Sequence, residues 1–167
     1  MKRTVSALLI VSLMMPTLAL AKVGSDKAAY FGGSVAEFSA AKDPVEGVLD
    51  IADADALVLH TSMHNLRIRY AKIEDLEYGQ KAGRRVGAAV GYTVLLGPLG
   101  LLTLFSKKRN HYLTIAYKDD NDKDQVAVLE LGKNIVRTTL PVVRTKSGKD
   151  ISFQDEEARK AAGMGTK

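Results

Sequence analysis

The feature that most constrains this chain is a run of twenty residues without a charged side chain, from Val86 to Phe105. As one straight helix the run would be about 30 Å long, enough to cross the hydrocarbon layer of a bilayer. Four glycines and a proline interrupt it, and clusters of basic residues close it at both ends. Any fold for this chain must therefore keep a long apolar segment out of water.

The spacing of the glycines favours a helical hairpin over one straight helix. Gly83, Gly87 and Gly91 recur every fourth residue, so on a helix they would form a smooth strip that another helix can approach closely. The turn signature Gly97-Pro98-Leu99-Gly100 then divides the run into arms of about 15 Å, which reach only partway into a bilayer. The residues predicted to contact a membrane or a second copy are Gly83, Gly87, Gly91, Gly97, Pro98, Gly100, Leu101, Leu102 and Phe105.

A hairpin would bring the basic clusters together at the lipid headgroups, where each cation contributes about 1 kcal/mol with anionic lipid. The predicted anionic-lipid flanks are Lys81, Arg84, Arg85, Lys107, Lys108 and Arg109. A single crossing would place the strands before and after the run in different compartments, which favours a re-entrant or surface hairpin. Two alternatives also cover the run: packing against a second copy, or packing as a buried helix pair within its own domain.

The N-terminus has the layout of a secretory signal. Lys2 and Arg3 precede an apolar run from Val5 to Met15, and Ala19-Leu20-Ala21 is a small-residue cleavage site. Cleavage there would leave 167 − 21 = 146 residues, one ordinary domain beginning at Lys22, with a net charge of 22 − 19 = +3. An uncleaved anchor is the alternative, but the apolar run is short for a membrane span.

The chain contains no cysteine, which excludes a disulfide framework, a thiol nucleophile and a lipoprotein anchor. The signal predicts export to the periplasm, and the apolar segment predicts association with a membrane. The basic residues are interspersed with acidic ones, and aromatic side chains do not alternate with a basic face. We therefore expect no nucleic-acid partner.

Short strands dominate the remaining pattern. Leu66, Ile68 and Tyr70 alternate with Arg67 and Arg69, which is typical of a strand with one buried face and one wet face. Similar short runs are expected over residues 45–51, 56–61, 73–78, 113–117, 126–131 and 151–153, with a hairpin turn over 119–124. The lead-in, residues 22–44, is expected to be loose, with a possible first or edge strand in Tyr30-Phe31-Gly32-Gly33.

A change of period after Leu131 predicts a helix. Ile135, Val136, Leu140 and Val143 fall near one side of it, with Asn134 as its cap, Gly148 at its end, and Pro141 expected to bend or divide it. Residues 154–167 predict a short helix in DEEARKAA and then a flexible tail.

This order of elements resembles that of pleckstrin-homology-like, or GRAM-like, domains. The resemblance covers residues 45–153 and is closest to small exported bacterial proteins of uncharacterised function that carry a glycine-rich apolar insertion, here residues 83–109. LEYGQKAGRRVGAAVG, GPLGLL and FSKKRNHYLTI carry it. It implies an α+β fold in which a small antiparallel sheet has a C-terminal capping helix and an inserted apolar helical hairpin, and it implies no catalytic residues.

Other candidate chemistry is sparse. His60 and His64 could share one end of a strand, but a metal site needs further fixed ligands. The acidic turn from Asp119 departs from a calcium loop, because Lys123 and Asp124 occupy positions where an acidic or amide ligand and a glycine are expected. No nucleophile elbow or phosphate loop occurs. We expect no enzyme and no cofactor.

Together these observations predict a non-catalytic, exported, membrane-associated binding or scaffold domain, attached through the apolar segment to a membrane surface or inner-membrane lipid, with an unknown protein partner. The alternative is a soluble periplasmic homo-oligomer assembled through the same segment. A small metal-binding protein or enzyme using His60 and His64 is the third possibility.

Overall fold

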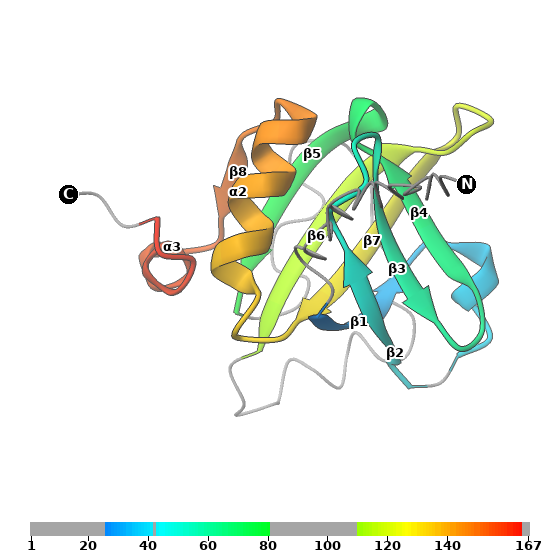
Figure 1. Cartoon of the computed structure of the whole chain (residues 1–167), viewed down its shortest axis with the longest axis horizontal. Coiled ribbons are helices and arrows are strands. Elements are labelled where there is room, and N and C mark those ends of the chain that lie inside the picture. The colour runs from blue at the N-terminus through cyan, green and yellow to red at the C-terminus, as the bar shows by residue number, and fades with distance from the viewer. Residues whose placement is uncertain (1–25, 42, 81–109, 165–167) are drawn as a thin grey trace, which may run out of the picture.

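The computed structural model describes residues 26–41, 43–80 and 110–164, and within them the chain is mainly β (Figure 1). The elements in chain order are β1 (Asp26–Gly33), η1 (Ala36–Phe38), β2 (Val45–Asp50), β3 (Ala56–Thr61), β4 (Asn65–Arg69), η2 (Tyr70–Lys72), β5 (Ile73–Gly79), β6 (His111–Lys118), β7 (Asp124–Leu131), α2 (Val136–Ser147), β8 (Ile151–Phe153) and α3 (Glu156–Ala161). The two η elements are short 3-10 helices.

The eight strands form one sheet in the order β4-β3-β2-β1-β7-β6-β5-β8. Neighbouring strands are antiparallel except β5 and β8, which are parallel with Leu76 opposite Ile151. The parallel pair follows from the helical crossover: β7 runs in the same direction as β5, and α2 returns the chain so that β8 takes that direction again.

The expected α+β class with an antiparallel sheet is therefore wrong. The sheet is mixed, and the helices α2 and α3 contribute only 12 and 6 residues. The described ranges contain no inserted helical hairpin. The segment for which the hairpin was predicted, residues 83–109, lies outside them.

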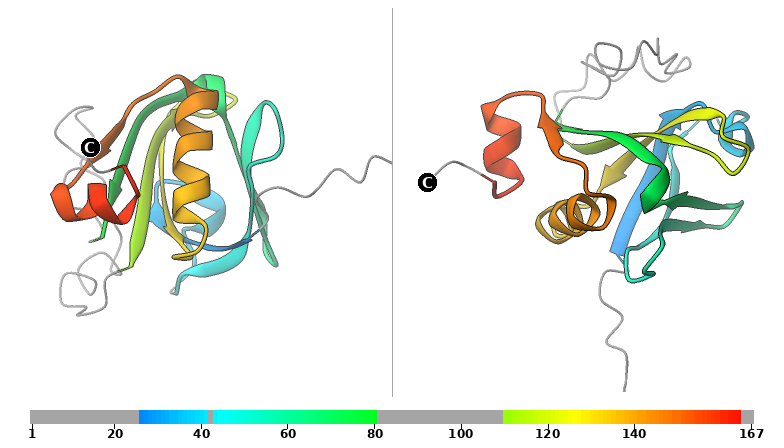
Figure 2. Two further views of the ribbon diagram at one scale, coloured as in Figure 1. Left: turned by 60° about the vertical axis from the view of Figure 1, so that its left-hand side comes forward. Right: turned by 90° about the horizontal axis from the view of Figure 1, so that it is seen from above.

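One face of the curved sheet surrounds the main core, a cluster of buried apolar side chains. Period-two alternation produces this face: in β4, Leu66 and Ile68 are buried while Arg67 and Arg69 are exposed, as the sequence predicts. Tyr70 does not continue the strand but begins η2, although its side chain is buried in the main core. Figure 2 shows α2 lying across the open side of the sheet.

Helix α2 closes this core with Val136, Leu140 and Val143. The N-cap is Ile135, without a side-chain hydrogen bond, so the prediction that Asn134 caps the helix is wrong. Pro141 is exposed and lies inside the helix without dividing it, since the chain continues helically to Ser147. Gly148 ends it as predicted, in the left-handed conformation with φ 68°.

Strand β1 lies at the centre of the sheet, not at an edge or in a loose lead-in. It pairs with β2 on one side and β7 on the other. Its last residue, Gly33, has φ 135°, and a Cβ there would lie 2.1 Å from the Val126 carbonyl oxygen. Only glycine therefore fits this close approach of β1 to β7.

The short C-terminal helix, α3, forms where the sequence predicts it. The Asp155 carboxylate accepts a hydrogen bond from the Ala158 backbone N–H at 2.7 Å, which caps the first turn of α3. Ala158 and Ala162 are buried in the main core. The described end of the chain thus belongs to the same packed unit as the sheet.

Candidate functional site

The predicted attachment segment lies outside the described residues, and so does the predicted signal peptide, residues 1–21. This applies to every residue predicted for membrane contact or self-association: Gly83, Gly87, Gly91, Gly97, Pro98, Gly100, Leu101, Leu102 and Phe105. It applies equally to the predicted flanks Lys81, Arg84, Arg85, Lys107, Lys108 and Arg109. The structure does, however, define the place where this segment joins the sheet.

The segment joins the sheet at one end of a single strand pair. Strand β5 ends at Gly79, β6 begins at His111, and Gly79 lies opposite Tyr112 in the antiparallel ladder. Paired strands are about 4.8 Å apart, and each residue extends the chain by at most about 3.6 Å. Because Lys81 follows Gly79 by two residues and Arg109 precedes Tyr112 by three, both basic clusters are tethered to the same end of the sheet.

A polar contact joins β5 to β6 at this end. The Tyr78 hydroxyl lies 2.6 Å from His111 Nδ1, and the two rings are stacked with centroids 6.1 Å apart. Burial raises the pKa of Tyr78 to about 12. Burial, followed by the positive charge of Lys133, lowers the pKa of His111. At neutral pH the Tyr78 hydroxyl is therefore protonated and donates a hydrogen bond to the neutral His111 imidazole.

Gly79 and Gln154 bring the C-terminal strand against the same end. A Cβ on Gly79 would lie 1.8 Å from the Gln154 side-chain carbonyl, and the Gln154 backbone N–H donates to the Tyr78 carbonyl at 3.1 Å. Asn110 Nδ2 also donates to the Tyr112 hydroxyl at 3.3 Å. The end of the sheet to which the segment is joined is therefore held by hydrogen bonds, and we call it the base of the segment.

The outer side of the sheet next to this base is apolar and buried. We define the apolar outer face as the outward side chains of β1, β6 and β7: Phe31, Tyr112, Thr114, Ala116, Val126 and Val128. All are at most 7% exposed, and Val128 at their centre is 0% exposed. Phe31, Tyr112 and Val128 form a cluster separate from the main core, with the Phe31 and Tyr112 rings edge to face at 4.9 Å.

The outer side of β2, β3 and β4 is different. We define the polar outer face as its exposed side chains: Glu46, Val48, His60, Asn65, Arg67 and Arg69. The small residues Ala56 and Val58 are buried between them, opposite Arg69 and Arg67. Long arginine stems cover such neighbours and keep the guanidinium groups in water.

None of the helices in residues 26–41, 43–80 and 110–164 is long and apolar enough to span a membrane.

The two histidines of the third interpretation belong to the β3–β4 turn. His60 Nδ1 lies 3.2 Å from Asn65 Oδ1, while the His64 ring lies edge to face with Phe38 at 6.3 Å. Thr61 Oγ1 donates to the His64 carbonyl at 2.6 Å and organises the turn. Across the described part of the chain, no group of three or more His, Cys, Asp or Glu side chains is placed to hold a metal ion.

The acidic turn between β6 and β7 is a hairpin, as predicted. The Asp119 carboxylate accepts hydrogen bonds from the backbone N–H groups of Asn121 at 2.8 Å and Lys123 at 3.0 Å, which holds the turn. Asp122 adopts φ 58° and pairs with Lys72. These carboxylates are engaged in turn formation and ion pairs, not directed toward a common centre.

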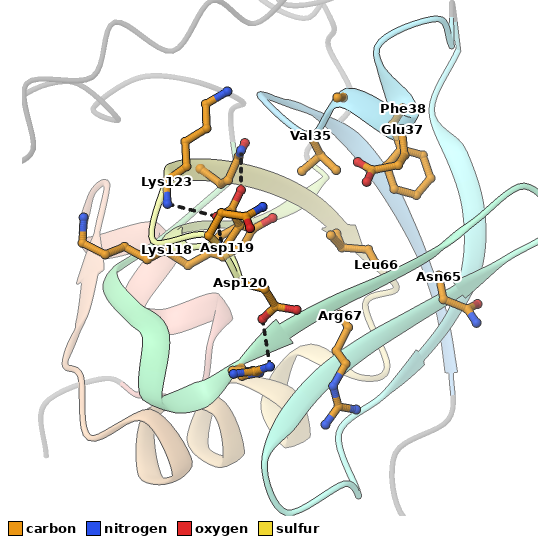
Figure 3. Close-up of a pocket in the computed structure, with 15 residues that line it drawn as sticks. Val35, Glu37, Phe38, Asn65, Leu66, Arg67, Lys118, Asp119, Asp120 and Lys123 are labelled. Atoms are coloured by element: carbon orange, nitrogen blue, oxygen red, sulfur yellow. Dashed lines mark hydrogen bonds and ion pairs between the residues drawn. The ribbon is translucent and has the colours of Figure 1, made fainter.

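A cavity of about 500 Å³ opens between η1, β4 and this turn (Figure 3). Val35, Phe38 and Leu66 supply its apolar wall. Both acidic and basic side chains line its rim, and Arg69 pairs with Asp120 at 3.0 Å. Arg67 pairs with Asp53 at 3.0 Å as well, and because the rim carries both signs of charge, the cavity has no consistent charge preference.

Comparison with known protein families and with curated proteins found no match, so no activity is transferred to this chain from a relative. The resemblance to exported proteins with a glycine-rich insertion stays a prediction.

Sequence reasoning missed the apolar outer face. Its signal was the run from His111 to Tyr117, HYLTIAY, in which no acidic or basic side chain other than histidine interrupts the strand. A strand buried on both faces shows such a continuous run instead of alternation. The structure confirms the strand and places Thr114 and Ala116 in a second buried layer.

Proposed function

We propose that this protein is a non-catalytic, exported binding or scaffold domain that attaches to a membrane surface through its apolar segment, residues 86–105. The observation that carries the proposal is the pairing of β5 with β6. A segment that leaves and re-enters the sheet at adjacent antiparallel strands must return to the side from which it started. This geometry supports a surface or re-entrant attachment and opposes a single crossing.

The charge distribution adds to this argument. Three basic residues follow β5 and three precede β6, and covalent tethering keeps both groups near one end of the sheet. Six cations on one side of a domain attract an anionic lipid surface, at about 1 kcal/mol for each one that reaches it. Burial of apolar side chains supplies the remaining affinity and the cations supply orientation. The polar outer face would remain available to a partner protein.

Vesicle flotation tests the proposal. Purified protein should float with vesicles that contain phosphatidylglycerol, and a variant in which residues 86–105 are replaced by a short Gly/Ser loop should stay at the bottom of the gradient. A matched variant with Lys107→Gln, Lys108→Gln and Arg109→Gln should float less, and the loss should grow with salt concentration.

Two results would overturn membrane attachment. One is wild-type protein that fails to float with anionic vesicles while remaining soluble and folded. The other is a stable assembly in light scattering that dissociates when Gly87 is changed to Leu and never binds vesicles. The second result would establish the homo-oligomer alternative, in which the glycine strip is a helix interface.

A further inference from the structure

The apolar outer face is buried within a single chain. Val128 is 0% exposed and Tyr112 is 5% exposed without any second copy or lipid. An aromatic side chain on the solvent side of an open sheet keeps far more of its surface in contact with water. An apolar face of this kind needs a cover that keeps water from it.

The described helices do not supply that cover. The apolar side chains of α2 and the buried alanines of α3 belong to the main core, on the opposite side of the sheet. The second cluster consists of strand residues alone: Phe31, Tyr112 and Val128. Within residues 26–41, 43–80 and 110–164, the buried apolar side chains of the helices thus lie on the other side of the sheet.

We propose that the apolar outer face is a docking site for the apolar segment of the same chain, residues 86–105. The segment is tethered to the sheet at both ends, through β5 and β6, directly beside Tyr112. It is the one internal stretch outside the described ranges with enough apolar side chains to cover several strands. Residues 22–25, which would precede β1 after removal of the signal, number only four.

Charge complementarity supports this occupant. Glu77 lies beside Thr114 on the same side of the sheet and is only 7% exposed. A carboxylate at that depth is stable only where hydrogen-bond donors or a cation reach it. The segment has basic residues at both of its ends, so its charge complements the acidic Glu77 beside the apolar side chains.

This docking adds a step to the proposed function, since a segment docked on the sheet must leave it, wholly or in part, to enter lipid. In water the face shelters apolar surface that would otherwise promote aggregation. The face and the membrane then offer alternative environments for the same side chains.

Thiol labelling tests the docking cleanly because the chain has no cysteine of its own. Thr114→Cys places a thiol on the apolar outer face, where the native side chain is 6% exposed. Its reaction with a maleimide should be slow in the otherwise intact protein. Replacing residues 86–105 with a short Gly/Ser loop should accelerate it by at least about tenfold, because labelling tracks exposure of the site.

Two matched cysteines control for folding and reagent access. Val48→Cys on the polar outer face, where the native side chain is 38% exposed, should label rapidly with and without the segment. Val143→Cys in the main core, where it is 0% exposed, should label slowly in both proteins and so report that the loop variant is folded.

Docking is overturned if Thr114→Cys labels as rapidly as Val48→Cys in the intact protein. It is also overturned if Thr114→Cys stays slow after the loop replacement while Val143→Cys shows the variant to be folded. Neither result depends on lipid. Failure of the intact protein to float with vesicles would instead remove the membrane proposal and leave docking in place.

Discussion

The outer sides of the two halves of the sheet differ in their exposure to water. On the polar outer face, Arg67 and Arg69 of β4 are exposed and lie opposite the buried residues Val58 and Ala56 of β3. On the apolar outer face, Phe31, Tyr112 and Val128 are buried against one another. One outer face is exposed and carries charged side chains, whereas the other is apolar and, in our proposal, is covered by another part of the chain.

This difference coincides with the place where the apolar segment joins the sheet. Strand β6 begins at the end of that segment and contributes Tyr112, Thr114 and Ala116 to the apolar outer face. Strands β2 to β4, which lie on the other side of β1, carry the polar outer face. The distribution of apolar residues on the outside of the sheet thus follows the chain connection, which is why changes to the two faces should have different effects.

The largest difference is expected from a charge placed at the centre of each face. Val128→Asp would bury a carboxylate at a site that is 0% exposed and should lower the free energy of unfolding by about 3 to 5 kcal/mol. Val48→Asp, at a site that is 38% exposed, should change it by less than about 0.5 kcal/mol. Urea unfolding followed by circular dichroism measures both, and equal losses would show that the two faces are not distinct.

A smaller effect is expected from removing one ring of the second cluster. Phe31→Ala should cost about 3 kcal/mol, because it removes a large side chain that is 7% exposed. Met63→Ala, at a 51% exposed site, is the matched control and should be nearly neutral.

A double-mutant cycle with Tyr112→Ala sharpens this result. The Phe31 and Tyr112 rings lie edge to face at 4.9 Å, so their coupling energy should be about 0.5 to 1.5 kcal/mol. Additive losses would mean that the two rings are buried independently and not as one cluster.

The sequence predicted the elements better than their arrangement. Alternation located β4, turn residues located the β6–β7 hairpin, and Gly148 located the end of α2, because each depends on local geometry. The central position of β1 and the parallel β5–β8 pair depend on long-range pairing, for which a short strand carries no local signal. The class was therefore wrong while most strands were right.

For the candidate site, the sequence identified the apolar segment but not the surface beside it. Twenty uncharged residues are conspicuous in any chain. The apolar outer face, by contrast, draws Phe31 from β1 and Val128 from β7, which come together only when the sheet forms. A face built from several strands can be predicted only when the pairing of those strands is known, whereas a continuous apolar run can be read directly from the sequence.

A pH dependence is expected at the base of the segment, beside the apolar outer face. The pKa of His111 is lowered in the folded protein, first by burial. Between the lowered value and the ordinary value of 6.5, the unfolded chain therefore binds more protons, so stability should fall as pH decreases through this window. His111→Gln should flatten the dependence between pH 7 and pH 5 in thermal unfolding. A wild-type profile that is flat there, or a dependence unchanged by the variant, would contradict it.

The smallest effect is expected at the ion pair between Arg67 of the polar outer face and Asp53 in the turn between β2 and β3. Hydrogen bonds from the Asp55 backbone N–H and then from the Arg67 side chain lower the pKa of Asp53 below its ordinary 3.8. The ionised Asp53 carboxylate therefore stabilises the folded protein. This stabilisation is present above about pH 3.8 and is lost as pH falls through the folded-state pKa. Asp53→Asn keeps an oxygen acceptor for the Asp55 N–H at 2.8 Å but lacks the charge, so it should weaken this acid dependence and slightly lower stability at pH 7. Arg67→Ala should have only a slight effect at pH 7, and high salt should abolish it, because exposed ion pairs are screened. If Arg67→Ala instead destabilised the protein as strongly as Phe31→Ala, the arginine stems would be essential cover for Val58, and the two halves of the sheet would depend equally on what lies over them.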